Sequence, residues 1–255
     1  PPRTSTQPGH SVNQSQMFQL LENATSVLLG TTATVAVAHA LLGIDHSIPF
    51  IVLGRSRQWS LGRTIVVTIV CGIGHVASSV AIGGLGAAAG VTLDSLMWVE
   101  SARGQVAATL LIGFGLAYAA WAVWRLLRGV THSHPHVHAD GTVHNHLHAH
   151  EGEHLHPHGM RMNLTPWALF IIFLFGPCEP LIPLMVVPAM SGAWAVLAAV
   201  VAIFGILTVV TMSVTVAIGY RLCPAVPRPG LTRAADLVAG LVVAASGAAV
   251  LFLGL

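Results

Sequence analysis

Six runs of apolar residues constrain the fold of this 255-residue chain more than any other feature. Each run is about 20 residues long, the length that a helix needs to cross about 30 Å of hydrocarbon. Only 8% of the residues are charged, none is lysine, and the mean hydropathy is +0.75. The sequence therefore predicts an all-α polytopic membrane protein with six transmembrane helices, near residues 25–51, 64–89, 105–127, 165–190, 193–220 and 234–254.

The arginines indicate how these spans are oriented. They cluster in the first, third and fifth connections, whereas the second has only Arg103, beside Asp94 and Glu100. Because cytoplasmic loops are enriched in arginine, we expect those three connections in the cytoplasm and both termini outside it.

The net charge of +2 gives no basic surface for nucleic acid. The predicted regions are a polar N-terminal segment (1–24), a first group of three helices (25–127), a cytoplasmic loop (128–163) and a second group of three helices (164–255).

Two short matches indicate that the second group of helices repeats the first. Asp45-His-Ser-Ile-Pro49 in the first span and Glu179-Pro-Leu-Ile-Pro183 in the fourth share an acid, two variable residues, isoleucine and proline. Val-Ala-Ile-Gly recurs at 80–83 and 216–219, near the ends of the second and fifth spans. A duplication of three spans inverts the second copy in the membrane, so we predict a 3+3 inverted repeat of the kind found in secondary transporters.

Prolines predict that the first and fourth spans are broken helices. A proline removes the backbone hydrogen bond to the carbonyl four residues earlier, so Pro49 frees the carbonyl of Asp45 and Pro183 that of Glu179. Pro177 and Pro180 add to the effect in the fourth span. Such carbonyls are tolerated at membrane depth where they are buried in protein or line a polar cavity. The alternative is a pair of simple packing kinks.

The apolar first span contains His39, Asp45 and His46, which are costly in a bilayer and therefore indicate a site. The two histidines share a helix face but lie about 10.5 Å apart along a straight helix, so joint ligation requires the helix to loosen at Gly43 or before Pro49. On a regular helix Asp45 points away from both histidines. It can therefore bind the metal only if the segment is unwound, and otherwise it would hydrogen-bond to the second nitrogen of a metal-binding imidazole.

Three more residues are candidate ligands: His75 in the second span and Cys178 and Glu179 in the fourth. His75 has the alternative of an interhelical hydrogen bond, and Cys178 that of a small packing residue. Imidazole, carboxylate and thiolate together suit nickel, cobalt, zinc or copper rather than magnesium or calcium. We expect Glu179 to act as a counter-charge or a proton acceptor.

Eleven of the fifteen histidines lie between the third and fourth spans, in alternating runs from His132 to His158. Alternating histidines interspersed with Asp140, Glu151 and Glu153 are typical of a flexible metal-binding tract. A pH-responsive loop is the alternative reading. On the predicted cytoplasmic side, the tract would capture, buffer or sense metal, or exchange it with a cytoplasmic donor or acceptor.

His39-Ala-Leu-Leu-Gly-Ile-Asp45-His46, Gly74-His75-Val-Ala-Ser-Ser and Gly176-Pro-Cys-Glu179-Pro resemble the signatures of the nickel/cobalt transporter (NicO) superfamily, including its UreH-like members. Five residues separate His39 from Asp45, whereas four do so in nickel/cobalt permeases. The resemblance covers most of residues 30–220. It implies a bacterial inner-membrane carrier for Ni²⁺ or Co²⁺, with a histidine-rich loop typical of the exporting branches.

The leading hypothesis is thus a secondary transporter of a divalent transition metal. The alternative is a membrane thiol–disulfide electron carrier, because Gly-Pro-Cys-Glu-Pro is similar to a stretch of the DsbD/CcdA proteins. That mechanism needs two exchanging cysteines, and the repeat position that matches Cys178 is Ile44. We expect neither a prosthetic group nor an enzyme, because the chain has no His-Glu-x-x-His or Gly-x-Ser-x-Gly motif. A metal sensor or chaperone without transport activity stays open.

Overall fold

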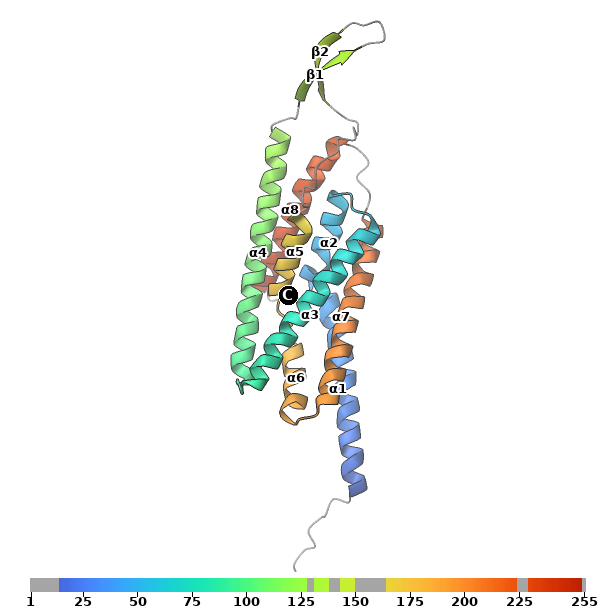
Figure 1. Ribbon diagram of the computed structural model, residues 1–255, viewed down its shortest axis with the longest axis vertical. Helices are drawn as coiled ribbons and strands as arrows, with labels where there is room; N and C mark the ends of the chain where they lie inside the picture. Colours follow the sequence, from blue (N-terminus) through green and yellow to red (C-terminus); the bar gives the residue numbers. More distant parts are fainter. Residues whose placement is uncertain (1–13, 128–130, 138–142, 150–163, 224–228, 254–255) are drawn as a thin grey trace, which may run out of the picture.

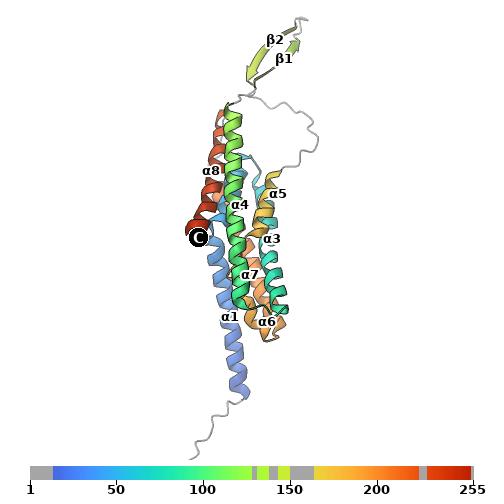
Figure 2. The ribbon, with the colours of Figure 1, turned by 90° about the vertical axis from the view of Figure 1, so that its left-hand side faces the viewer.

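The structure, a computed structural model, describes residues 14–127, 131–137, 143–149, 164–223 and 229–253. Within them the chain forms an elongated bundle of helices, and a two-stranded hairpin is drawn beyond one end of it (Figure 1). At the opposite end, α1 extends past the other helices in both views (Figure 2). The helices are α1 (Gln14–Leu42), α2 (Ile44–Ser56), α3 (Leu61–Ala88), α4 (Leu93–Leu127), α5 (Leu164–Phe175), α6 (Leu181–Met190), α7 (Trp194–Leu222) and α8 (Pro229–Leu253).

Five helices in the described part of the chain are long and apolar enough to cross a membrane: α1, α3, α4, α7 and the Ala234–Leu253 part of α8. The helices α5 and α6 are also apolar, but each is too short to cross alone. By length and composition, the chain is therefore built as a multi-pass membrane protein. The helical bundle agrees with the predicted fold class. Helix α1 begins at Gln14, inside the predicted polar segment, and residues 1–13 lie outside the described part.

The predicted first span is interrupted at a single residue, Gly43, between α1 and α2. The backbone of Gly43 is extended (φ −70°, ψ 95°), yet its N–H still donates to the carbonyl of His39 at 3.0 Å. Its carbonyl accepts from the N–H of His46 at 3.1 Å. Of the two positions that the sequence left open, the structure thus uses Gly43, and Pro49 lies inside α2.

The predicted fourth span is interrupted over residues 176–180, between α5 and α6. Pro177 and Pro180 lie in this break, and neither has an N–H with which to continue a helix. Pro183 falls in the first turn of α6, where a proline removes no intrahelical bond. Both predicted interruptions of the apolar runs are therefore present, and the second is longer than the first.

One expectation about the connections is wrong. Helix α4 begins at Leu93, whereas the sequence predicted the third span from residue 105. Glu100 and Arg103 therefore lie inside a helix and not in a loop between spans. Glu100 is completely buried. The physical reason is that the two charges neutralise each other across one helical turn, so the helix continues through them.

Tight turns join α3 to α4 and α6 to α7. Each turn contains a glycine at φ +69°, Gly90 and Gly192, where a side chain would be strained. The residue after each glycine donates back to the preceding helix, Val91 to Gly86 and Ala193 to Pro188, both at 2.9 Å. These bonds satisfy the last carbonyls of the helix and reverse the chain.

Helices α4 and α8 cross in close contact through small residues. A Cβ added at Gly115 would lie 2.4 Å from the backbone nitrogen of Ala244, and one added at Gly240 would lie 2.6 Å from that of Ala119. Two small-x-x-x-small pairs, Gly115/Ala119 and Gly240/Ala244, thus face each other, as in closely packed membrane helices. Elsewhere α1 packs on α7, and α3 packs on both α5 and α6.

The histidine-rich region contains an antiparallel hairpin of β1 (Thr131–Val137) and β2 (Val143–Ala149). The register aligns histidines across the two strands: His132 with His148, His134 with His146, and His136 with His144. This part of the predicted flexible tract is therefore paired, because its alternating pattern suits a strand as well as a loop. Residues 138–142 and 150–163, with the other histidines of the tract, lie outside the described part.

Candidate metal centre

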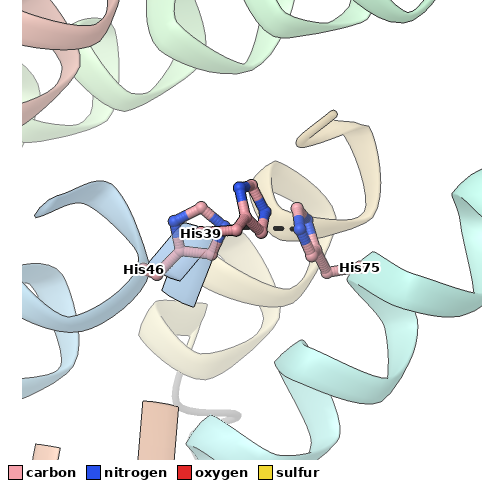
Figure 3. A group of neighbouring side chains, drawn as sticks. All are labelled: His39, His46 and His75. Atoms are coloured by element: carbon pink, nitrogen blue, oxygen red, sulfur yellow. Dashed lines mark hydrogen bonds between the residues drawn. The ribbon is translucent and has the colours of Figure 1, made fainter. Parts of the chain in front are cut away.

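Three imidazoles from three helices meet inside the bundle. His39 comes from the last turn of α1, His46 from the first turn of α2, and His75 from the middle of α3. One nitrogen of each ring lies within 4.8 Å of the other two, and the rings turn toward one another (Figure 3). Among the described residues, this is the group of side chains whose spacing suits a metal ion.

The break at Gly43 explains how His39 and His46 come together. On a continuous helix they would lie about 10.5 Å apart along the axis, whereas their ring centroids are 4.7 Å apart. The residue at the break has to be glycine, because a Cβ at position 43 would lie 2.1 Å from Nδ1 of His46. The missing side chain makes room for the imidazole.

Asp45 fixes the orientation of the His46 ring. Its Oδ1 lies 2.9 Å from Nδ1 of His46, so that Nδ1–H donates to the carboxylate and the Nε2 lone pair faces His75. This is the carboxylate–histidine arrangement that orients many metal-binding imidazoles. Of the two roles that the sequence left open for Asp45, the geometry matches the outer-shell role.

The distance between His46 and His75 fits a coordination site. Their Nε2 atoms are 3.3 Å apart, close enough for one ring to donate a hydrogen bond to the other. With metal–nitrogen bonds of about 2.1 Å, two ligand nitrogens of a tetrahedral site lie about 3.4 Å apart, and neighbouring nitrogens of a square-planar site about 3.0 Å. The observed separation is closer to the tetrahedral edge.

The surroundings of the imidazoles are apolar. His46 is 4% exposed and His75 is 2% exposed, whereas His39 is partly buried. The ring of Phe173 contacts His46 and His75 edge-on, and Phe204 lies beside His39. A cation at this position would therefore interact with its ligands in a low dielectric, with little competition from water.

Cys178 and Glu179 of the second break lie in different settings relative to the histidines. Cys178 is fully buried, and its Sγ is 3.7 Å from Nε2 of His39. Glu179 is exposed in the structure and lines the cavity that the histidines also line. The fold thus places the Cys178 thiol beside the histidine cluster and the Glu179 carboxylate on the wall of the cavity.

A cavity of about 620 Å³ leads to the cluster. It lies between the two helix breaks, α4 and the end of α8, and its polar lining includes His39, Asp45, His46, His75, Gln105 and Glu179. Every predicted site residue except Cys178 is among the lining residues. The cluster therefore lies on the wall of a cavity between helices.

A second polar group, which was not predicted from the sequence, is formed by Glu100 and Arg103 of α4 with Ser78 and Ser79 of α3. Glu100 and Arg103 form an ion pair. A signal for Glu100 exists in the repeat: Glu100 and Gly104 stand 136 positions before Asp236 and Gly240, the same offset as Val80 before Val216. Asp236 is also buried, and it accepts a hydrogen bond from Tyr118 at 2.7 Å and pairs with Arg125.

The fold and this site together define the class of the molecule: a polytopic membrane protein with a tri-histidine cluster buried between broken helices. No protein-family model, no curated protein and no solved structure matches the chain.

Proposed function

We propose that the protein is a secondary transporter of a divalent transition-metal cation, Ni²⁺ or Co²⁺ in the first place, across the inner membrane of a bacterium. His39, His46 and His75 bind the ion, and Asp45 orients His46. The observation that carries the proposal is the convergence of three imidazoles at a helix break deep inside an apolar bundle. Buried ionisable groups at such a place commonly mark an ion pathway.

We also propose that α5 and α6 form one broken span, which gives six spans in a 3+3 inverted repeat. In this arrangement α1–α2 corresponds to α5–α6, α3 to α7, and α4 to α8. The packing supports it, because α1 contacts α7 just as α5 and α6 contact α3, while α4 and α8 cross each other through matching small residues. The metal site then lies where the two halves meet, as in other transporters with broken helices.

The second candidate function, the thiol–disulfide carrier, has less support. Cys71, Cys178 and Cys223 are all free thiols, and Cys178 faces an imidazole. Cys71 packs in a different hydrophobic cluster from Cys178. Metal binding accounts for the surroundings of Cys178 without a second cysteine.

Transport of metal into proteoliposomes tests the proposal directly. We expect purified protein to move Ni²⁺ or Co²⁺ to a dye inside the vesicles, and the double variant His39→Ala/His46→Ala to abolish the signal. A matched control is His132→Ala in the hairpin, which keeps the intramembrane cluster intact. Transport by the double variant at the wild-type rate would refute the assignment of the site, and an absence of flux from the wild type with every metal would refute the carrier.

The histidine-rich region is proposed to act on the cytoplasmic side as a place where metal is captured or handed over. Reporter fusions within residues 128–163 and at both termini test this orientation, with the region expected inside and the termini outside. Deletion of residues 131–149 is expected to weaken metal capture at low concentration while the intramembrane site stays functional. A region found outside the cytoplasm would contradict this role.

A further inference from the structure

The side chains of Glu100 and Arg103, which form an ion pair, make hydrogen bonds to the backbone of the second helix break. Nη2 of Arg103 donates to the carbonyl oxygens of Leu174 at 3.0 Å and Gly176 at 3.2 Å, where α5 ends. Inside the break, the N–H of Cys178 donates to Oε2 of Glu100 at 3.1 Å and to Oγ of Ser79 at 3.2 Å. The ion pair thus replaces the hydrogen bonds that a continuous helix would have made.

The charges of Arg103 and Glu100 are complementary to the backbone groups at the end of α5 and in the chain that leads into α6. The C-terminal end of α5 carries unpaired carbonyls and a partial negative charge, and it meets the guanidinium of Arg103. The chain leading into α6 presents a backbone N–H, and it meets the carboxylate of Glu100. We call Glu100, Arg103, Ser78 and Ser79 the clasp.

The clasp is also connected to the histidine cluster through α3. Ser78 accepts from Nη2 of Arg103 at 2.7 Å and donates to the carbonyl oxygen of His75 at 2.8 Å. Ser79 lies one helical turn after His75 and donates to Oε2 of Glu100 at 3.0 Å. One network therefore fixes the backbone of a cluster histidine and the backbone of Cys178.

We propose that the clasp positions Cys178 as a fourth ligand, so that the site binds its ion with three imidazole nitrogens and one thiolate sulfur. This inference rests on the proposed function and specifies the kind of ion that the site takes. Glu100 and Arg103 are positioning residues, because they act through the backbone of Cys178 and do not contact the ion. On metal binding, the thiol of Cys178 releases its proton to solvent and the sulfur forms a bond to the metal.

Two of the separations match a tetrahedral ion, whereas the three imidazole nitrogens as a group lie up to 4.8 Å apart, so the ligands have to draw closer when the ion binds. Cys178 Sγ lies 3.7 Å from His39 Nε2, and a tetrahedral site with metal–nitrogen bonds of about 2.1 Å and metal–sulfur bonds of about 2.3 Å has a nitrogen–sulfur edge of about 3.6 Å. The nitrogen–nitrogen separation of 3.3 Å agrees with the same geometry. Three imidazoles and a thiolate in tetrahedral arrangement suit Zn²⁺ and Co²⁺ better than square-planar Ni²⁺.

Titration of purified protein with Co²⁺ tests the proposal, because a cobalt–thiolate bond adds a charge-transfer absorption that imidazole ligands alone do not produce. We expect this absorption and the visible bands of tetrahedral Co²⁺ in the wild type. Cys178→Ser removes the charge-transfer absorption. Glu100→Gln is expected to remove most of it although Cys178 is present, with an affinity for Co²⁺ reduced about 10- to 100-fold, as for other outer-shell changes.

Two further variants keep the test decisive if Glu100→Gln does not fold. Ser79→Ala deletes one of the two acceptors of the Cys178 N–H and leaves the ion pair, so a partial loss of the absorption is expected. Asp236→Asn is the matched control, because Asp236 is another buried acid, which accepts from Tyr118 and pairs with the more exposed Arg125, and it does not contact the break. It is expected to keep the absorption.

The outcomes separate this inference from the proposed function. Co²⁺ binding by the wild type without a charge-transfer absorption overturns the thiolate ligand and leaves the histidine site standing. An unchanged absorption in both Glu100→Gln and Ser79→Ala overturns the role of the clasp. No binding of Co²⁺, Zn²⁺ or Ni²⁺ by the wild type overturns the proposed function itself.

Discussion

The two helix breaks each interrupt an apolar run of the chain, but they satisfy their backbone in different ways. The break at Gly43 is one residue long and keeps its own hydrogen bonds, with the Gly43 N–H donating to His39 and the Gly43 carbonyl accepting from His46. The break at residues 176–180 contains two prolines and is held by side chains of α3 and α4. The shorter break is thus satisfied by its own backbone, whereas the longer one also depends on the side chains of the clasp.

A shared feature of the breaks is a glycine that makes room for a cluster histidine. A Cβ at Gly43 would lie 2.1 Å from Nδ1 of His46, and a Cβ at Gly176 would lie 2.9 Å from Nδ1 of His75. Neither glycine has a positive φ, so space and not backbone conformation requires it. The two breaks thus close around the same cluster from two sides.

The largest expected difference between the breaks lies in the residues that they contribute to the site. His46→Ala removes an imidazole and leaves the carboxylate of Asp45 without its partner, so metal affinity is expected to fall by more than the 10- to 100-fold that is typical of outer-shell changes. Cys178→Ser, which keeps three imidazoles, is expected to lower affinity less. Isothermal titration with Co²⁺ and Zn²⁺ measures both, and an equal loss would mean that the two breaks contribute equally.

The second-largest difference is expected between substitutions of the acidic residues of the two breaks, Asp45 and Glu179. Asp45→Asn keeps the shape of the side chain but removes the carboxylate that orients His46, so affinity is expected to fall about 10- to 100-fold. Glu179→Gln changes a residue of the cavity wall and is expected to leave affinity nearly unchanged while it slows transport. Equilibrium titration and initial rates in proteoliposomes separate the two effects. A larger loss of affinity from Glu179→Gln would place Glu179 on the ion.

The smallest expected effects come from the glycines. Gly43→Ala forces the His46 ring aside and is expected to weaken metal binding about tenfold, or about 1.4 kcal/mol, and Gly176→Ala less, because its contact is less severe. Gly30→Ala in α1 is the control, since nothing lies within 4 Å of its added Cβ. It is expected to stabilise the helix by up to about 1 kcal/mol and leave affinity unchanged. Equal effects at positions 30 and 43 would remove the steric argument.

Patterns within single helices were predictable from the sequence because they depend on local chemistry. Apolar run length predicted the long helices, and the prolines and Gly43 predicted that the first and fourth spans would be interrupted. The histidines and acids of the candidate site are predictable because imidazoles and carboxylates are costly in an apolar span. Three of them, His39, His46 and His75, are brought together by the fold.

A pair of charged residues beside an apolar run predicts the end of a span, so the sequence places Glu100 and Arg103 in a connection. Only their hydrogen-bond partners show otherwise, and those partners are distant in sequence: Ser79 on α3 and the backbone of Leu174, Gly176 and Cys178. Burial of an ion pair depends on hydrogen bonds from several elements. A local pattern does not contain that information.

The sequence by itself determined that this chain is apolar enough for a membrane, that two of its spans are interrupted, and which rare polar side chains they carry. The tertiary structure alone decided that the interruption at Gly43 brings His39 and His46 together, that His75 of another helix completes the cluster, and that the clasp holds Cys178 beside it. The physical reason is the separation along the chain of the residues that interact. Hydropathy and helix breaking act over neighbouring residues, whereas a metal site is defined by distances of a few ångströms between residues far apart in the chain.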